Sequence, residues 1–198
     1  GLAAAISFSA SVWNLGTEGM VYFGMITGTM AAHWMDAFPP LIAVPLVLVA
    51  AFVGGAVLAW LCNLLQQHFG VNIMMSSLLI ANAIFYLGFL LVEGPMRDTS
   101  SGQGVTSYAV NESFMFTKIL PPSDLDTGLF LALALAVLVY LAMRSSKTGY
   151  EISITGRNPV FARYGGINTI AVTSLAMILS GGLSGVGSMA YVLNNAGR

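Results

Sequence analysis

Long apolar runs separated by short polar segments organise this chain. Uncharged, mostly apolar residues fill positions 41–61 and 73–92, and the pattern returns at 127–143 and 169–193. About 20 apolar residues in a helix cross a bilayer core of about 30 Å. The pattern therefore predicts an all-α protein, a polytopic bundle of transmembrane helices.

The first apolar region, 2–32, differs from the others because Glu18 interrupts it. A carboxylate inside a membrane segment costs roughly 2.5 to 3.5 kcal/mol on insertion scales. Flanking glycines and the preceding Asn14 indicate a broken helix, which at membrane depth is tolerated only when buried in protein or lining a watery cavity. We expect Asn14 and Glu18 to lie on or beside a solute path, or Glu18 to cap the second half-helix by accepting N–H bonds and complementing its dipole.

Two further patterns concern contacts between helices. Asn82 is strongly polar in the middle of the 73–92 run, and either a hydrogen bond to another helix or a place on the solute path would explain it. Small residues recur at four-residue spacing, which lets helix backbones approach closely. These are Gly24 and Gly28, then Ala51, Gly55 and Ala59, then Gly181 and Gly185. For the segment 180–185, a broken helix is the alternative to ordinary packing.

Composition agrees with one membrane domain over 1–198. Hydrophobic residues make up 57% of the chain and charged residues 8%, whereas soluble proteins carry about 25% charged residues. The net charge of −1 argues against nucleic-acid binding, which needs clustered cations. His33 and His68 have no second ligand at metal-binding spacing, so no metal site is expected. A phosphate loop and a nucleophile–base pair are also missing from the sequence, so no catalytic residue or bound cofactor is expected.

The distribution of Lys and Arg along the chain predicts its orientation in the membrane. The segment 144–168 holds four of the seven Lys and Arg residues and a single acid. Lys and Arg near helix ends mark the cytoplasmic side, so 144–168 is predicted to be cytoplasmic. The alternation of spans then places 93–126 outside.

A short helix is predicted within this cytoplasmic segment. Asn158 followed by Pro159 is typical of a helix start, and Gly165-Gly166 of its end. One or two turns are not stable alone in water, so neighbouring helices or a partner must hold them. The nearby cations and aromatics suit a protein interface, although contact with anionic lipid headgroups is the alternative. They are Arg157, Phe161, Arg163 and Tyr164.

The order of these motifs resembles the permease subunits of bacterial ABC importers, in the branched-chain amino acid, ribose and nucleoside permease family. Asn14–Gly19 is similar to N-I-G-x-E-G, typical of the simple-sugar and nucleoside branch. Phe69–Asn82 is similar to the family motif F-G-V-N-E-V-I-x-T-L-M-L-N, and Glu93–Asp98 is similar to the loop G-P-L-R-D. Thr148–Ile167 resembles the cytoplasmic loop T-x-x-G-x-x-x-x-A-x-G-x-N-P-x-A-A-R-Y-A-G-I. Ser180–Gly185 is similar to S-G-A-L-A-G. Met20 and Ile73 depart from the family pattern, which has Gln and an acid there.

The resemblance implies a permease in the bacterial inner membrane that imports a nucleoside or simple sugar. It implies a cytoplasmic ATPase that carries ATP and Mg, an extracytoplasmic substrate-binding protein, and a second permease copy or paralogue. The residues implied in ATPase coupling are Gly156, Arg157, Asn158, Pro159, Phe161, Arg163 and Tyr164. Family members have more spans than the five predicted, so the chain is expected to be part of a longer permease. The alternatives are a branched-chain amino acid permease of the same family and an ion-coupled transporter using Glu18.

Overall fold

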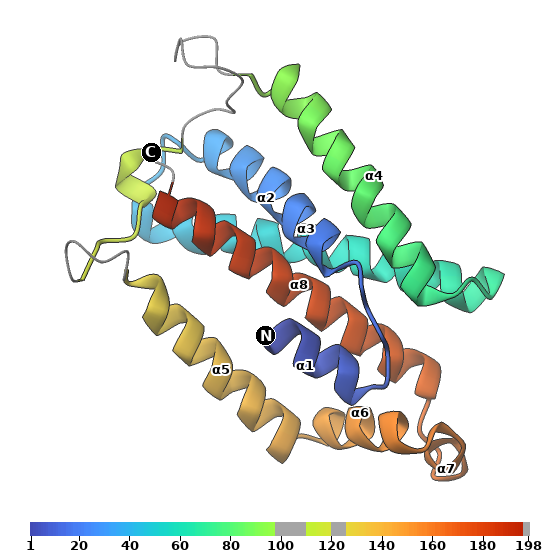
Figure 1. The fold of residues 1–198 in the computed structure, drawn as a ribbon. Helices are drawn as coiled ribbons and strands as arrows, with labels where there is room; N and C mark the ends of the chain where they lie inside the picture. The colour runs from blue at the N-terminus through green and yellow to red at the C-terminus, as the bar shows by residue number, and fades with distance from the viewer. Residues whose placement is uncertain (98–109, 120–125, 196–198) are drawn as a thin grey trace.

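The computed structural model describes residues 1–97, 110–119 and 126–195. These residues are mainly helical, and no strand occurs among them beyond one isolated bridge between Lys118 and Asp126. The helices are α1 (Leu2–Ser9), α2 (Thr17–Trp34), α3 (Pro40–Phe69), α4 (Ile73–Glu93), α5 (Gly128–Ser145), α6 (Lys147–Arg157), α7 (Pro159–Tyr164) and α8 (Thr169–Asn195), with a 3-10 turn η1 at Glu112–Phe114 (Figure 1). The prediction of an all-α helical bundle is confirmed.

Four helices in the described part of the chain are long and apolar enough to cross a membrane, namely α3, α4, α5 and α8. They coincide with four of the five predicted segments. The first predicted segment is divided between α1 and α2, and neither half meets the same criterion. α2 nevertheless lies inside the bundle, packed against α3, α8 and α4.

The centre of the bundle is the contact of α2, α3 and α8, where small residues meet. A β-carbon added at Gly24 would lie 2.5 Å from the Gly185 α-carbon, and one added at Gly55 would collide with the Gly181 carbonyl. Glycine is therefore required where these backbones touch. Close packing explains the four-residue spacing of small residues.

α8 runs unbroken through 180–185. The alternative of a broken helix at this segment is therefore wrong. Its adjacent glycines are held by packing on α3, because Gly181 lies against Ala59 and Gly182 against the ring of Phe52. Tertiary contact thus overrides the weak helix preference of glycine.

Successive helices end at opposite ends of the bundle. At one end, the Asn111 side-chain amide donates to Asp36 Oδ1 at 2.8 Å, beside the end of α2. At the other end, Gln67 Nε2 donates to the Ile170 carbonyl at 3.3 Å, near the α6–α7 segment. This is the arrangement that the predicted alternation requires, while the side of the membrane at which each end lies stays a prediction. Asp98 and Asp124 of the predicted outer loop lie outside the described residues.

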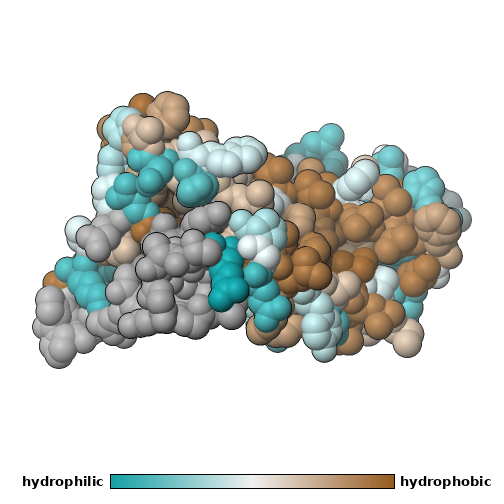
Figure 2. Space-filling model, turned by 90° about the horizontal axis from the view of Figure 1, so that it is seen from above, coloured by the Kyte–Doolittle hydropathy of each residue, from teal (hydrophilic) through white to brown (hydrophobic). Residues whose placement is uncertain are grey.

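The outer helices leave much apolar surface uncovered. In the most apolar 18-residue stretch of α5 no residue is buried, and in that of α4 only 11% of the residues are buried. Figure 2 shows hydrophobic side chains across a broad area of one face. Such surface is compatible with lipid or with further permease helices, and not with water.

Candidate solute pathway and coupling segment

The break predicted near Glu18 is present, and residues 10–16 connect α1 to α2. α1 ends in a Schellman motif, in which Ser11 N donates to the Phe8 carbonyl and Val12 N to that of Ser7, at 2.9 and 3.0 Å. Ser11 has a φ of 59° and is the non-glycine residue with positive φ in the described chain. This conformation is costly for an L-residue with a side chain. The break is therefore a strained, hydrogen-bonded turn.

Asn14 braces this connection. Its side chain is 4% exposed; Oδ1 accepts from Gly16 N at 3.0 Å, and Nδ2 donates to the Met20 sulfur at 3.2 Å. Both ends of the amide are therefore used within the break and the first turn of α2. This geometry fits a brace better than the predicted contact with solute.

Glu18 lies in the first turn of α2, and its side chain is exposed. Its carboxylate accepts no hydrogen bond from the described residues, so the predicted capping of N–H groups is not found. Its position at the helix start still complements the positive end of the α2 dipole. The carboxylate remains available for another group.

Asn82 is also exposed, in the middle of α4. Its Nδ2 donates to the Leu78 carbonyl of its own helix at 2.9 Å. The predicted hydrogen bond to another helix is therefore not present in the described part of the chain. The amide oxygen has no hydrogen-bond partner among the described residues.

α2 and α4 run parallel, and their contacting residues keep a nearly constant offset along the two helices. The pairs in contact are Gly16 with Ser77, Gly19 with Ala81, Tyr22 with Phe85 and Ile26 with Gly88. Glu18 therefore lies at nearly the same height in the bundle as Asn82. Asn82 is nine residues into α4, about 14 Å from its start, near the middle of a membrane span.

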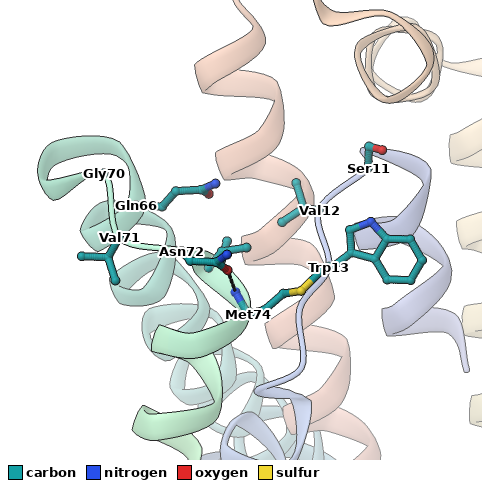
Figure 3. A pocket seen from close by; sticks show the side chains of 9 residues that line it. Ser11, Val12, Trp13, Gln66, Gly70, Val71, Asn72 and Met74 are labelled. Atoms are coloured by element: carbon teal, nitrogen blue, oxygen red, sulfur yellow. Dashed lines mark hydrogen bonds between the residues drawn. The ribbon is translucent and has the colours of Figure 1, made fainter.

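A crevice with mixed polar and apolar walls lies at the end of the bundle where α1 stops. A cavity of about 510 Å³ and one of about 340 Å³ share Ser11, Val12 and Gln66 in their walls. In Figure 3 the Gln66 side chain extends from α3 towards Val12. The Trp13 ring turns towards α1 instead, where it packs 5.1 Å from Phe8.

The turn between α3 and α4 forms one wall of this crevice. Gly70 ends α3 with a φ of 66°, a conformation that favours glycine. Asn72 then begins α4, its side chain accepting from Met74 N at 2.9 Å. These two geometries give a physical reason for the Gly-Val-Asn sequence at this turn.

The predicted short helix is confirmed as α7. Asn158 Oδ1 accepts from Phe161 N at 3.0 Å, Pro159 occupies the first turn, and Gly166 follows with a φ of 79°. The helix α6, which precedes α7, was not predicted from the sequence. Two signals mark α6: Ser146 Oγ accepts from Gly149 N at 3.0 Å as an N-cap, and Lys147 pairs with Glu151 at 3.6 Å.

α7 presents an apolar and aromatic face outward. Val160 and Phe161 are each 60% exposed and Tyr164 is 89% exposed, and the neighbouring Arg157 is exposed too. Ala162, on the opposite side of the helix, is 1% exposed. α7 is thus anchored by one side and free on the other.

Arg163 is exposed as expected for the coupling segment, but it also contacts α8. Its Nε donates to Thr169 Oγ1 at 3.1 Å, and Thr169 is buried at the start of α8. The bond fastens α7 to α8. Arg163 therefore has a structural role in the segment.

Gly156 faces the interior, against α1. A β-carbon at this position would collide with the Ser9 carbonyl oxygen and lie 2.9 Å from the Ser9 carbonyl carbon. Next to it, Thr155 is 3% exposed, and its hydroxyl has no hydrogen-bond partner among the described residues. Of the seven predicted coupling residues, Gly156 therefore touches α1, whereas Arg157, Phe161 and Tyr164 face outward. No cluster of three metal-ligating side chains occurs in the described ranges.

Comparison with known proteins agrees with this architecture. The profile of the family described as "Branched-chain amino acid transport system / permease component" matches residues 1–197. The chain is 28% identical to a glucose ABC transporter permease of Haloferax volcanii, with 100% of this chain and 54% of that protein aligned. It is 24% identical to a nucleoside ABC transporter permease of Lactococcus lactis, over 96% of this chain and 54% of that protein.

A guanosine ABC transporter permease of Bacillus subtilis is 25% identical, over 94% of this chain and 53% of that protein. The chain thus spans about half the length of these curated relatives. No solved structure matches it. The match over nearly the whole chain, together with the helical membrane architecture, shows that the chain belongs to the permease component family of branched-chain amino acid transport systems, with sugar and nucleoside ABC permeases among its relatives.

Proposed function

We propose that this chain forms part of the membrane permease of an ATP-driven importer for a nucleoside or simple sugar, in a bacterial inner membrane. The observation that carries the proposal is α7. A capped, two-turn helix is held by α6 and α8, yet turns Phe161 and Tyr164 to the outside. Aromatic side chains with a neighbouring arginine are typical of protein interfaces.

The partner that fits this face is a cytoplasmic ATPase subunit, which would bind ATP and Mg. The relatives named for glucose, nucleoside and guanosine transport support the same class of solute here. An extracytoplasmic binding protein would deliver the solute to the other end of the bundle. A second permease copy or paralogue would complete the pore.

The contacts of α6 suggest how ATPase movement reaches the membrane. A force on α7 passes to α6, whose Gly156 rests on the end of α1. α1 leads through the strained turn at Ser11 to the start of α2 and Glu18. Closure of the ATPase pair would thereby shift the α1–α2 break, which borders the crevice.

The test is uptake by the full-length permease in proteoliposomes with its ATPase and binding protein. We expect uptake of nucleoside or glucose to require ATP inside the vesicles and to be unaffected when proton and sodium gradients are collapsed. Uptake that followed an ion gradient and ignored ATP would contradict the proposal and favour an ion-coupled transporter using Glu18.

A further inference from the structure

Glu18 poses a problem for a helix in a membrane. Its carboxylate is exposed, without a hydrogen-bond donor in the described chain, and lies level with the middle of α4. A carboxylate facing lipid is strongly unfavourable, and ionisable groups in spans face a bundle interior or a watery path. The side of α2 that carries Glu18 is therefore turned away from lipid in the assembled permease.

Asn82 lies on the same side of the α2–α4 pair. Successive residues of an α-helix are turned by about 100°. This places Glu18 beside Tyr22 on α2, and Asn82 beside Phe85 on α4. The Tyr22 and Phe85 rings touch, with centroids 5.2 Å apart and planes at 68°. Both polar side chains therefore lie on the side of the helix pair where these two rings meet.

The aromatic contact itself is open. Tyr22 is 38% exposed and Phe85 42%. A third ring, that of Tyr86, packs on Phe85 at 5.7 Å and is 71% exposed. A carboxylate, an amide and aromatic rings thus share one uncovered surface at mid-span height. We call this set (Glu18, Tyr22, Asn82 and Phe85) the α2–α4 surface.

We propose that the α2–α4 surface binds the transported solute during passage, and that the solute is an uncharged ring compound rich in hydroxyl or N–H donors. The Glu18 carboxylate accepts such donors, and so does the Asn82 amide oxygen, since its nitrogen donates to Leu78. The rings of Tyr22 and Phe85 pack on the apolar face of a sugar or base. Glu18 supplies negative charge and no described cation lies on this surface, so anionic solutes are disfavoured.

The inference rests on the proposed import function but can fail separately from it. The first experiment uses the full-length permease with its native cysteines, Cys62 included, replaced, and with Tyr22→Cys introduced. A membrane-impermeant maleimide should label this cysteine, and guanosine or glucose at millimolar concentration should slow the labelling. A site that stays unlabelled, because other permease helices or a second copy cover it, would overturn the proposal. Labelling that neither solute slows would do the same.

The second experiment compares variants in the same background. Glu18→Gln should raise the concentration of solute giving half-protection by about tenfold, since a charge-assisted hydrogen bond is weakened. Phe85→Leu should raise it as well, whereas Leu87→Ala should not. Leu87 is 41% exposed, and it lies two residues beyond Phe85, which turns it by about 200° to the opposite face of α4. ATP-dependent uptake by the wild type would establish the proposed import function. If the wild type shows ATP-dependent import, but neither Glu18→Gln nor Phe85→Leu changes the solute concentration that gives half-protection, the solute-binding proposal is wrong.

Discussion

Gly156 at the end of α6 packs on the backbone carbonyl of Ser9 at the end of α1. The first residue belongs to the segment predicted to meet the ATPase, and the second ends the half-helix that leads to Glu18. Because both partners are backbone, no rotation of a side chain can relieve a crowded contact. The proposed coupling route therefore passes through a point that tolerates only glycine.

Gly156→Ala tests this point. The added methyl group must push α6 from α1, so we expect ATP-dependent uptake to fall at least about tenfold while the ATPase still co-purifies. Overpacking at a tight contact costs about 1 to 3 kcal/mol, enough to shift the position of α6 without unfolding a membrane bundle. Gly165→Ala is the matched control, because a β-carbon there meets its nearest atom at an ordinary 3.4 Å. Normal uptake by Gly156→Ala would show that the contact does not transmit movement.

Ser11→Gly should stabilise the turn between α1 and α2. Ser11 is held at a φ of 59°, a conformation that costs a residue with a side chain roughly 1 to 2 kcal/mol. We expect the melting temperature of the detergent-solubilised permease to stay the same or rise with Ser11→Gly and to fall with Ser11→Val. Equal melting temperatures for the two variants would contradict the strained geometry.

Arg163 and Thr169 should behave as a coupled pair. The hydrogen bond between them fastens α7 to α8, and a typical bond of this kind contributes about 0.5 to 1.5 kcal/mol. In a double-mutant cycle of Arg163→Met and Thr169→Val, the two losses of stability should be less than additive by about that amount. Fully additive losses would show that the bond contributes nothing.

The centre of the bundle should reject larger residues. Gly185→Leu places a side chain where the Ala51 carbonyl lies and should prevent assembly of α3 with α8. Gly187→Leu on the same helix is the control, since nothing lies within 4 Å of a β-carbon there. The amount of monodisperse permease extracted in mild detergent measures the difference. Equal yields would contradict the packing described for α8.

Much of the fold follows from the sequence because membrane spans and caps are local signals. The apolar runs gave α3, α4, α5 and α8, and Asn158-Pro159 gave the start of α7. The continuity of α8 at 180–185 did not follow, since it depends on packing against Ala59 and Phe52 from a distant part of the chain.

The site was harder to predict, because side-chain roles depend on neighbours. Asn14 and Glu18 are four residues apart, yet one is buried in a brace and the other is exposed. Arg163 matched an interface pattern, but its hydrogen bond goes to Thr169. Tyr22 and Phe85 could not be identified as site residues from the sequence, because their contact depends on how α2 packs against α4.

The most direct test of the proposed function is to remove the exposed aromatic side chains of α7 and ask whether the ATPase still binds. A tagged full-length permease would be purified from membranes as wild type, as Phe161→Ala/Tyr164→Ala and as the control Trp34→Ala, a variant at the opposite end of the bundle whose side chain is 78% exposed. We predict that an ATPase co-purifies with the wild type and with Trp34→Ala and is lost from the double variant. An ATPase retained by the double variant, or absent from the wild type, would contradict the assignment of α7 as the docking helix.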